Sequence, residues 1–506
     1  MFSDVILSLL LFFPLLASLF TFLIPGKSKG TVKVFALYIS LINLALSVYM
    51  YFKFQNTDGF QFVIDVPWNS ELGISFKLGV DGISLFLIMI TTFFTPVSIL
   101  STWNKKIEKE TMFYASILML ESFLIGSVIA IDVFLFYVFW ELMLIPMFFM
   151  VGVWSESKNT AIVSKFFVYT MIGSLGMLFS ILYVYQAHHN QSGYYSFDLM
   201  DFYNTTINPS MAPLLFFSFL IAFAVKAPLF PFHTWLPDTY TDAPVSATVM
   251  LSAVMAKMGV YGMIRFVIPL FPATFSQYGN LLMTLAVIGT IYGGLIAIVQ
   301  KDIKRLIAYS SISHLGYIIL GVFALNIQSL QGSVFHMVNH ALSTGALFLL
   351  VAFLEERLRS RDISQAGGLM KLIPSFGILF MIAMFSSIGL PGLNGFVGEL
   401  LIFLGVFGTS PLFSALGASG VIIGAVYMLW MFQRVMFGPV NENTVLEYKK
   451  LKGNEIAILI PISILIFVLG VYPQPFLNKI EPSVTKYIEF VHTKKISTQE
   501  IAYYKQ

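Results

Sequence analysis

The sequence predicts an all-α integral membrane protein with about fourteen transmembrane helices. The first observation is composition: hydrophobic residues fill 57% of the 506 positions and charged residues 11%, whereas a soluble domain has about half and about a quarter. The second is pattern, because the chain contains apolar runs of about twenty residues, the length of a spanning helix. Strands of a membrane barrel would alternate over roughly ten residues. Backbone groups in hydrocarbon must be paired internally, so helices are favoured.

The apolar runs place each span. The first run has no basic lead-in and no cleavage motif, so it is interpreted as the first span and not as a signal peptide. In chain order, the predicted spans are 4–25, 31–53, 79–103, 111–130, 132–154, 161–187, 211–236, 243–270, 278–299, 302–325, 328–355, 372–409, 411–437 and 454–473.

The distribution of lysine and arginine tests this count. With the N-terminus outside, 19 of the 29 basic residues fall in loops predicted to lie inside, seven fall outside and three lie within spans. Basic residues gather in cytoplasmic loops, and one missed or extra span would reverse every loop that follows. The pattern supports fourteen spans with both termini outside. A bacterial inner (plasma) membrane is the expected location, since no transit segment is recognisable.

Several function classes are excluded by what the sequence lacks. The chain has no cysteine, which rules out thiolate-held iron–sulfur clusters, cysteine-ligated zinc and disulfides. No phosphate-binding loop or dinucleotide fingerprint is present. We therefore expect no cofactor in this chain, and any redox chemistry would take place on another subunit. The net charge of +3 gives no indication of nucleic acid, and the lipid bilayer is the expected environment.

Two spans are predicted to be broken helices. Pro228 and Pro231 directly follow Lys226, and Pro391 lies shortly before Glu399. Proline removes a backbone donor and clashes with the preceding turn, so it interrupts a helix. The two breaks lie five spans apart, which predicts two five-helix repeats. Because five is odd, the second repeat is inverted in the membrane, and such repeats with broken helices are typical of transporters.

The repeats divide the chain into four predicted parts. These are N-terminal helices 1–3 at 1–110, a first five-helix repeat (a proton half-channel) at 111–270, a second inverted repeat at 278–437, and the last span with a C-terminal tail at 438–506.

Ionisable residues inside the spans are the candidate functional groups. Each costs about 2.5–3.5 kcal/mol near the bilayer centre, so each needs a reason to be there. The set comprises Glu121, Glu141, Lys226, Lys257, Arg265, His314, His340 and Glu399.

Glu141 and Lys226 form an acid and base pair on different helices. One interpretation is a salt bridge that joins two helices, although buried pairs stabilise poorly. The other is a proton switch, because a desolvated lysine that loses its counter-ion tends to release its proton. The break at Pro228 would supply the mobile element.

Lys257 shares a helical face with Tyr261 and Arg265, at four and eight residues' distance. Lys257 lies too deep for its ammonium to reach the interface, which favours a proton-carrying role. Arg265 is near the outer end of its span. It could simply extend its guanidinium to the interface or take part in the transfer, and both interpretations stay open.

The histidines allow several interpretations. His314 lies on a face with Ser310 and Tyr317, a polar stripe that could hold water, although a lone histidine is more often a satisfied core residue. His336 and His340 are one turn apart, a spacing that suits a metal, but their helix offers no third ligand. Haem ligation would need paired histidines on facing helices. Imidazole titrates near neutral pH, which suits a relay.

Glu399 follows the second break and would be the terminal proton carrier of the second repeat. Arg434 or helix-end backbone groups could instead be its structural partners. Glu121, in the fourth span, is expected to play a supporting part.

Five long motifs, in this order, resemble one known family. They are FYVFWELMLIPMFFMVGVW (136–154), VKAPLFPFHTWLPDTYTDAPVSATVMLSAVMAKMGVYGMIR (225–265), KRLIAYSSISHLGY (304–317), HMVNHALSTGALFLL (336–350) and GLPGLNGFVGE (389–399). The chain resembles, over essentially its whole length, the antiporter-like subunits of respiratory complex I, most closely those of the subunit M or chain 4 type.

This resemblance implies specific roles. It implies a Glu141–Lys226 pair, a central Lys257, relay histidines His314 and His340, and a terminal carboxyl. The family's histidine after the first break corresponds to His233, and Pro228 and Pro391 correspond to its helix breaks.

The resemblance also implies a function and partners. The expected function is proton translocation driven by electron transfer from NADH to quinone, with flavin, iron–sulfur clusters and quinone in partner subunits. Chain-2-like and chain-5-like antiporter subunits are the expected neighbours. Two alternatives are a subunit of a multisubunit sodium/proton antiporter, whose relatives tend to carry lysine at the Glu399 position, and a scaffold without transport.

Overall fold

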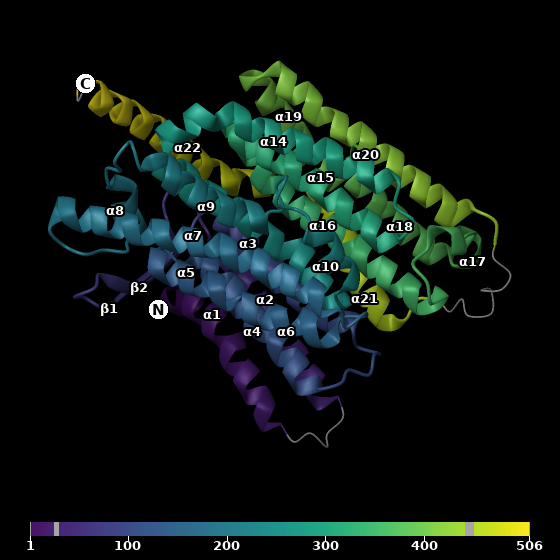
Figure 1. The fold of residues 1–506 in the computed structure, drawn as a ribbon. Helices are drawn as coiled ribbons and strands as arrows, with labels where there is room; N and C mark the ends of the chain where they lie inside the picture. Colours follow the sequence, from purple (N-terminus) through teal and green to yellow (C-terminus); the bar gives the residue numbers. More distant parts are fainter. Residues whose placement is uncertain (1, 25–29, 441–449, 505–506) are drawn as a thin grey trace.

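The computed structural model describes residues 2–24, 30–440 and 450–504. Within these ranges, twelve helical segments are long and apolar enough to cross a membrane, and they pack side by side in one elongated bundle (Figure 1). Eleven of the segments are α1 (Phe2–Phe20) with the short η1 (Thr21–Leu23), α2 (Thr31–Lys53), α3 (Ser84–Ser101), α4 (Glu110–Ile129), α5 and α6 (Val133–Leu142 and Leu144–Trp154), α7 (Thr160–Ser192), α14 (Pro272–Ile298), α15 (Ile303–Phe323), α16 (Ile327–Leu358), α20 (Pro411–Phe437) and α21 (Gly453–Val471).

The twelfth segment, Val245–Leu270, is a rod that changes its helical pitch twice. It runs through α11 (Val245–Met250), η2 (Leu251–Met255), α12 (Ala256–Gly262), η3 (Met263–Val267) and α13 (Ile268–Leu270). Both η2 and η3 are π-helical, a wider turn that is rare and often found at functional sites. The rod and α16 are buried along their whole apolar windows, so they form the core of the bundle.

Two further crossings are broken, as the prolines predicted. The seventh consists of α9 (Ala212–Lys226) and α10 (Leu236–Asp242), and the twelfth of α18 (Pro374–Ser387) and α19 (Asn394–Thr409). With the twelve segments above, they complete the fourteen predicted crossings. The all-α membrane class and its two broken helices are confirmed.

The two breaks share one backbone device. At the first, the Leu229 amide donates to the Ala224 carbonyl at 2.9 Å, and at the second the Leu390 amide donates to the Phe385 carbonyl at 3.0 Å. Each bond reaches back five residues instead of the usual four, so it closes the last turn where the helix stops. The Trp235 indole also donates to the Val225 carbonyl at 2.9 Å, which satisfies a backbone group that the first break exposes.

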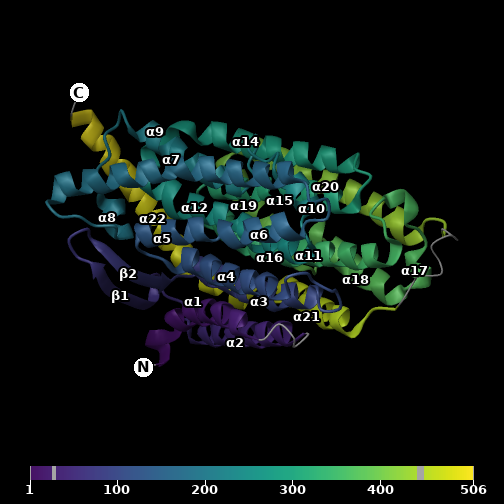
Figure 2. The ribbon, with the colours of Figure 1, turned by 60° about the horizontal axis from the view of Figure 1, so that its bottom comes forward.

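Two elements were not predicted. The strands β1 (Gln61–Asn69) and β2 (Ile74–Val80) form an antiparallel hairpin between the second and third crossings. The C-terminal tail is a helix, α22 (Gln474–Tyr504), that extends beyond the last crossing. The hairpin, the short α8 (Leu199–Asn204) and the chain's C-terminus lie at one end of the bundle, and α17 (Leu369–Leu372) lies at the other (Figures 1 and 2).

Ion pairs between loops agree with the crossing count. Glu356 at the end of α16 pairs with Lys105 at 3.1 Å and with Lys452 at 2.9 Å. These residues belong to three different loops that fourteen crossings place on one side of the membrane. At the opposite end, Lys77 of β2 pairs with Asp198, and both belong to loops predicted to lie on the other side. The short η4 (Ile363–Gln365) completes the loop after α16.

Candidate functional site: a buried row of acids, lysines and histidines

The first break holds Lys226 and faces Glu141. Lys226 is the last residue of α9 and is 2% exposed. Its ammonium lies over the ring of Trp140, the residue directly before Glu141, 4.7 Å from the centroid. Lys226 Nζ and Glu141 Oε1 both lack a hydrogen-bond partner among the described residues. The structure therefore places the acid and the base as neighbours without a direct hydrogen bond, and their switching role stays a prediction.

His233 and Pro228 lie in the same break. The His233 ring is buried and stacks on Phe230 at 5.5 Å between centroids, with the edge of Tyr292 5.1 Å away. These contacts are with aromatic rings, so the structure gives His233 a packing environment beside the break.

Lys257 lies at the centre of the rod. It is completely buried, and its ammonium donates to the Ser252 carbonyl in the preceding π-helical turn. The turn that accepts this hydrogen bond, η2, packs against α16, the helix that carries His336 and His340. The widened turn is what leaves this carbonyl available to a side chain.

Tyr317 joins His314 to Glu399. Its hydroxyl donates to Glu399 Oε1 at 2.9 Å and also contacts His314 Nδ1. The other ring nitrogen of His314 lies 3.4 Å from the Ser387 hydroxyl at the second break. All of these groups are buried. Groups on α15, α18 and α19 are thereby linked in a continuous polar contact, the arrangement that proton transfer between titratable groups requires.

The second break shapes the pocket around Glu399. Gly389 has φ +71°, and a Cβ at that position would lie 2.1 Å from Glu399 Oε2. Pro391 follows in the same turn between α18 and α19. The Asn394 carbonyl accepts from the Asn339 amide at 2.7 Å, which fixes the start of α19 against α16. The carboxyl is therefore seated directly against the backbone of the break.

His340 stacks on His314, with ring centroids 5.2 Å apart, and neither of its ring nitrogens has a hydrogen-bond partner in the described part of the chain. One ligand atom from each of His314, His336 and Glu399 lies within 4.8 Å of the others. Two imidazoles and a carboxylate suit Zn²⁺. The sequence offers no third metal ligand beside His336 and His340 and predicts no metal there, whereas the structure groups His336 with His314 and Glu399. The Tyr317 hydroxyl already contacts both His314 and Glu399, so a metal bound to these two side chains would have to displace both contacts.

Arg265 does not extend its guanidinium to the interface. It is 6% exposed and pairs with Asp81 through a 2.6 Å contact, and its Nε donates to the Tyr261 hydroxyl at 3.2 Å. Tyr261 in turn donates to the Val128 carbonyl at 2.8 Å. Asp81 was missed because it is the third residue of the predicted span 79–103, where an acid is expected to reach the interface; the structure places it just before α3. The interface interpretation of Arg265 is wrong, because Asp81, in the short segment between β2 and α3, pairs with it inside the protein.

Glu121 stands apart from this row. It is completely buried in α4, and its Oε1 accepts from the Asn43 amide at 2.9 Å while Oε2 has no partner among the described residues. Its partner comes from α2, among the N-terminal helices. The structure thus brings Lys257, His314, His340 and Glu399 together and places Glu141 with Lys226 at the first break, but it leaves Glu121 in another part of the bundle.

Fourteen crossings, two broken helices and a buried row of titratable groups define an integral membrane protein of an architecture that secondary transporters also use. The matching family model is described as NADH:quinone oxidoreductase/Mrp antiporter, transmembrane, and it covers residues 130–449. NADH-ubiquinone oxidoreductase chain 4 of Marchantia polymorpha is 38% identical over 96% of this chain and 97% of its own length. NADH-quinone oxidoreductase subunit M of Rickettsia conorii is 37% identical, covering 95% and 98%.

Solved structures agree in fold. A chain of respiratory complex I from Thermus thermophilus superposes with a TM-score of 0.87 at 29% identity, over 96% of this chain and 99% of that one. A chain of the Mrp complex from Dietzia superposes with a TM-score of 0.84 at 19% identity, over 97% and 99%, which shows the shared fold alone. The chain belongs to the NADH:quinone oxidoreductase/Mrp antiporter family and, within it, to the subunit M or chain 4 group.

Proposed function

We propose that this chain is the proton-translocating membrane subunit of an NADH–quinone oxidoreductase. The observation that carries the proposal is the buried contact His314–Tyr317–Glu399 beside Lys257. Titratable groups on three helical segments, α15, α19 and the rod, meet there inside the bundle, where an ionisable side chain is costly and therefore indicates function. A scaffold protein could have apolar residues at each position.

In the proposed route, protons enter at the first break and load Lys257 by way of Lys226. They pass through the His314 and His340 region to Glu399 and leave on the outer side. Residues 111–270 would form the first half-channel and residues 278–437 the second, inverted one. Bound water would bridge the gaps between groups that do not touch.

The driving reaction would take place on other subunits of the complex. We expect flavin, iron–sulfur clusters and quinone there, because this chain has no cysteine to hold a cluster. Chain-2-like and chain-5-like antiporter subunits are the proposed neighbours. The proposed setting is a bacterial plasma membrane, with both termini of this chain outside.

The first test is the stoichiometry of pumping in the assembled complex. We expect Glu399→Gln and Lys226→Ala each to lower NADH-driven proton uptake into vesicles by about tenfold or more, since a relay that loses its proton-holding group stops transferring. The control is Glu71→Gln, an exposed carboxyl between the two strands. Uptake at the wild-type ratio of protons to NADH in both site variants would contradict the proposal. Sodium/proton exchange without any NADH oxidation would favour the antiporter alternative.

A further inference from the structure

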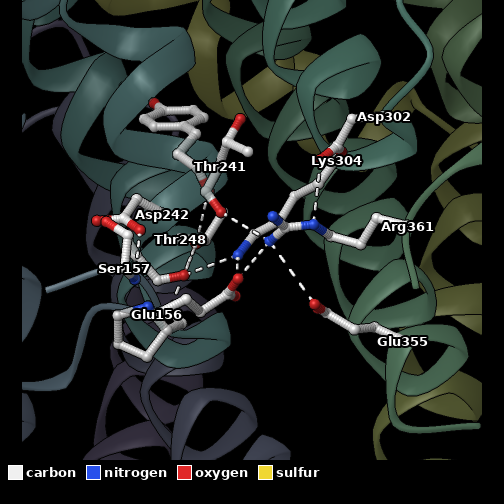
Figure 3. A network of polar contacts seen from close by, with 12 residues as sticks. Glu156, Ser157, Thr241, Asp242, Thr248, Asp302, Lys304, Glu355 and Arg361 are labelled. Atoms are coloured by element: carbon white, nitrogen blue, oxygen red, sulfur yellow. Dashed lines mark hydrogen bonds and ion pairs between the residues drawn. The ribbon is translucent and has the colours of Figure 1, made fainter. Parts of the chain in front are cut away.

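A second polar cluster lies at one end of the bundle, away from the buried row. We call it the loop cluster and define it by Glu156, Asp242, Asp302, Lys304, Glu355 and Arg361, whose side chains converge in Figure 3. These residues come from the loop after α6, the corner between α10 and α11, the start of α15, and the end of α16 with the loop that follows it. Neither the predicted site nor the proposed route uses them.

Lys304 is the buried centre of the loop cluster. Its side chain is 3% exposed, although it lies in the first turn of α15, where a lysine could reach water. Its ammonium donates to Glu156 Oε1 at 3.0 Å and to the Ala243 carbonyl at 2.8 Å. One cation thereby holds a carboxylate of the loop after α6 and a backbone carbonyl of the α10–α11 corner.

Arg361 surrounds the same carboxylate from the other side. Its guanidinium pairs with Glu156, pairs with Asp302 at 3.1 Å, and donates to the Thr241 carbonyl at 3.0 Å. Glu355 lies 3.7 Å from it. Glu156 therefore bridges two cations that both belong to the second predicted repeat or to its loops.

The backbone fixes Glu156 to the corner of the first predicted repeat. The Glu156 amide donates to the Asp242 carbonyl at 2.9 Å, and the Ser157 amide donates to Asp242 Oδ1 at 2.8 Å. The corner Ala243–Pro244 lies between α10 and the rod. Any displacement of α10 or of the beginning of the rod must therefore move Glu156 against Lys304 and Arg361.

The two helices joined at the loop cluster carry the central groups of the buried row. The rod begins at Val245 and carries Lys257, and α15 begins at Ile303 and carries His314, ten residues after Lys304. At about 1.5 Å per residue, both groups lie roughly 15–20 Å from the cluster. A rigid helix transmits a shift at its end to its middle over this distance.

We propose that Lys304 is a positioning residue for proton transfer, holding the rod and α15 at the separation that Lys257 and His314 need. The proposal rests on the proposed function. It places the connection between the rod and α15 at the loop cluster, outside the buried row. A buried ion pair is a poor stabiliser but can specify one arrangement of helices. The loop cluster contains four carboxylates and two cations, so removal of the Lys304 charge leaves Glu156 with Arg361 alone and weakens the connection between the repeats.

The experiment compares Lys304→Met with Lys301→Met in the assembled complex. Lys301 is an exposed lysine three residues earlier, in the loop that precedes α15. We expect Lys304→Met to assemble in normal amount but to lower the ratio of protons translocated to NADH oxidised by about twofold or more, and Lys301→Met to leave it unchanged. The conservative variant Lys304→Arg should retain most of the ratio, because it keeps a cation beside Glu156. If Lys304→Met reduces assembly, Arg361→Gln replaces it, since Arg361 contacts the same carboxylate.

Two results would overturn the inference. One is a wild-type ratio in assembled Lys304→Met and Arg361→Gln complexes. The other is a fall in assembled complex with no change in the ratio for either variant, which would mean that the loop cluster only stabilises the fold. Failure of the proposed function is distinguishable, because in that case Glu399→Gln would also pump normally.

Discussion

Arg265 shows how one side chain is decided by a partner far away in the sequence. It lies near the end of a span, where a guanidinium often reaches the interface. Here Asp81, 184 residues earlier, approaches within 2.6 Å and both side chains are at least nine-tenths buried. The Tyr203 hydroxyl donates to the Arg265 backbone carbonyl at 2.7 Å. A fixed ion pair of this kind closes one end of the rod that carries Lys257.

We therefore expect Arg265→Met to destabilise the protein by about 3–5 kcal/mol, because it leaves the Asp81 carboxylate buried without its counter-ion. The double variant Asp81→Asn with Arg265→Met should lose much less, since neither charge remains. Thermal unfolding in detergent measures both, and double-mutant analysis gives the coupling. Equal losses in the single and the double variant would show that packing of the arginine, and not the ion pair, matters.

At the scale of elements, irregular segments hold the functional groups. Lys226 ends one broken helix, Glu399 packs against the backbone of the other break, and Lys257 lies between two π-helical turns. The regular helices around them contribute the apolar wall. The shared five-residue hydrogen bond at the two breaks shows that the discontinuities are built into the backbone. At the widened π-helical turn, the Lys257 ammonium meets the Ser252 carbonyl, a group that a regular helix would have paired internally.

The hairpin is attached to the start of α5 by a helix cap that should depend on pH. Asp132, before α5, accepts from the Leu135 amide at 2.9 Å and from the Ser75 amide of β2 at 3.0 Å, and burial raises its pKa to about 6. The folded state therefore binds this proton more tightly than the unfolded chain, so the Asp132 contribution to stability decreases as pH rises from about 4 to above 6.

Asp132→Asn keeps a side-chain cap and removes this titration. We expect its melting temperature, relative to that of the natural protein, to rise between pH 5 and pH 7.5. Asp132→Ala should lose about 1 kcal/mol or more at every pH, because it cannot cap. Differential scanning calorimetry of the purified proteins between pH 5 and pH 7.5 measures these melting temperatures. A difference in melting temperature between the Asn variant and the natural protein that stays constant with pH would rule out the shifted titration.

At the scale of the whole molecule, the two ends of the bundle differ in their loops. Ion pairs join the loops before α4, after α16 and before α21 at one end, while the hairpin and α22 lie towards the other (Figure 2). The backbone Gly82 amide donates to the Ser483 hydroxyl of α22 at 2.8 Å. Both ends are thus held by contacts between segments that are distant in the sequence. If an odd number of crossings lay between two such segments, they would be on opposite sides of the membrane and could not meet.

The absence of cysteine makes this topology directly testable. Single cysteines introduced at Glu71, in the hairpin turn, and at Lys158, in the loop after α6, are both exposed positions. We expect a membrane-impermeant maleimide to label position 71 from outside in intact cells, and position 158 only in inverted vesicles. Permeabilised cells should label both. Labelling of both positions from the same side would contradict the three crossings, formed by α3, α4 and α5 with α6, that separate them.

The sequence by itself determined the membrane class, the fourteen crossings and the two breaks. Apolar length and the identity of proline are local properties, and the basic loops constrain sidedness. It also singled out Lys226, Lys257 and Glu399, because a charged residue within an apolar run can be recognised without knowing which residues surround it in space.

Only the tertiary structure decided which of these groups meet. Helical periodicity placed Tyr317 on the face of His314, but the contact of Tyr317 with Glu399 depends on how α15 packs against α19. The same holds for Asp81 with Arg265, and for the loop cluster around Lys304. The hairpin and α22 also escaped prediction, since neither has the apolar length of a span. The physical reason is that burial is encoded residue by residue, whereas a partner is selected by the packing of distant helices.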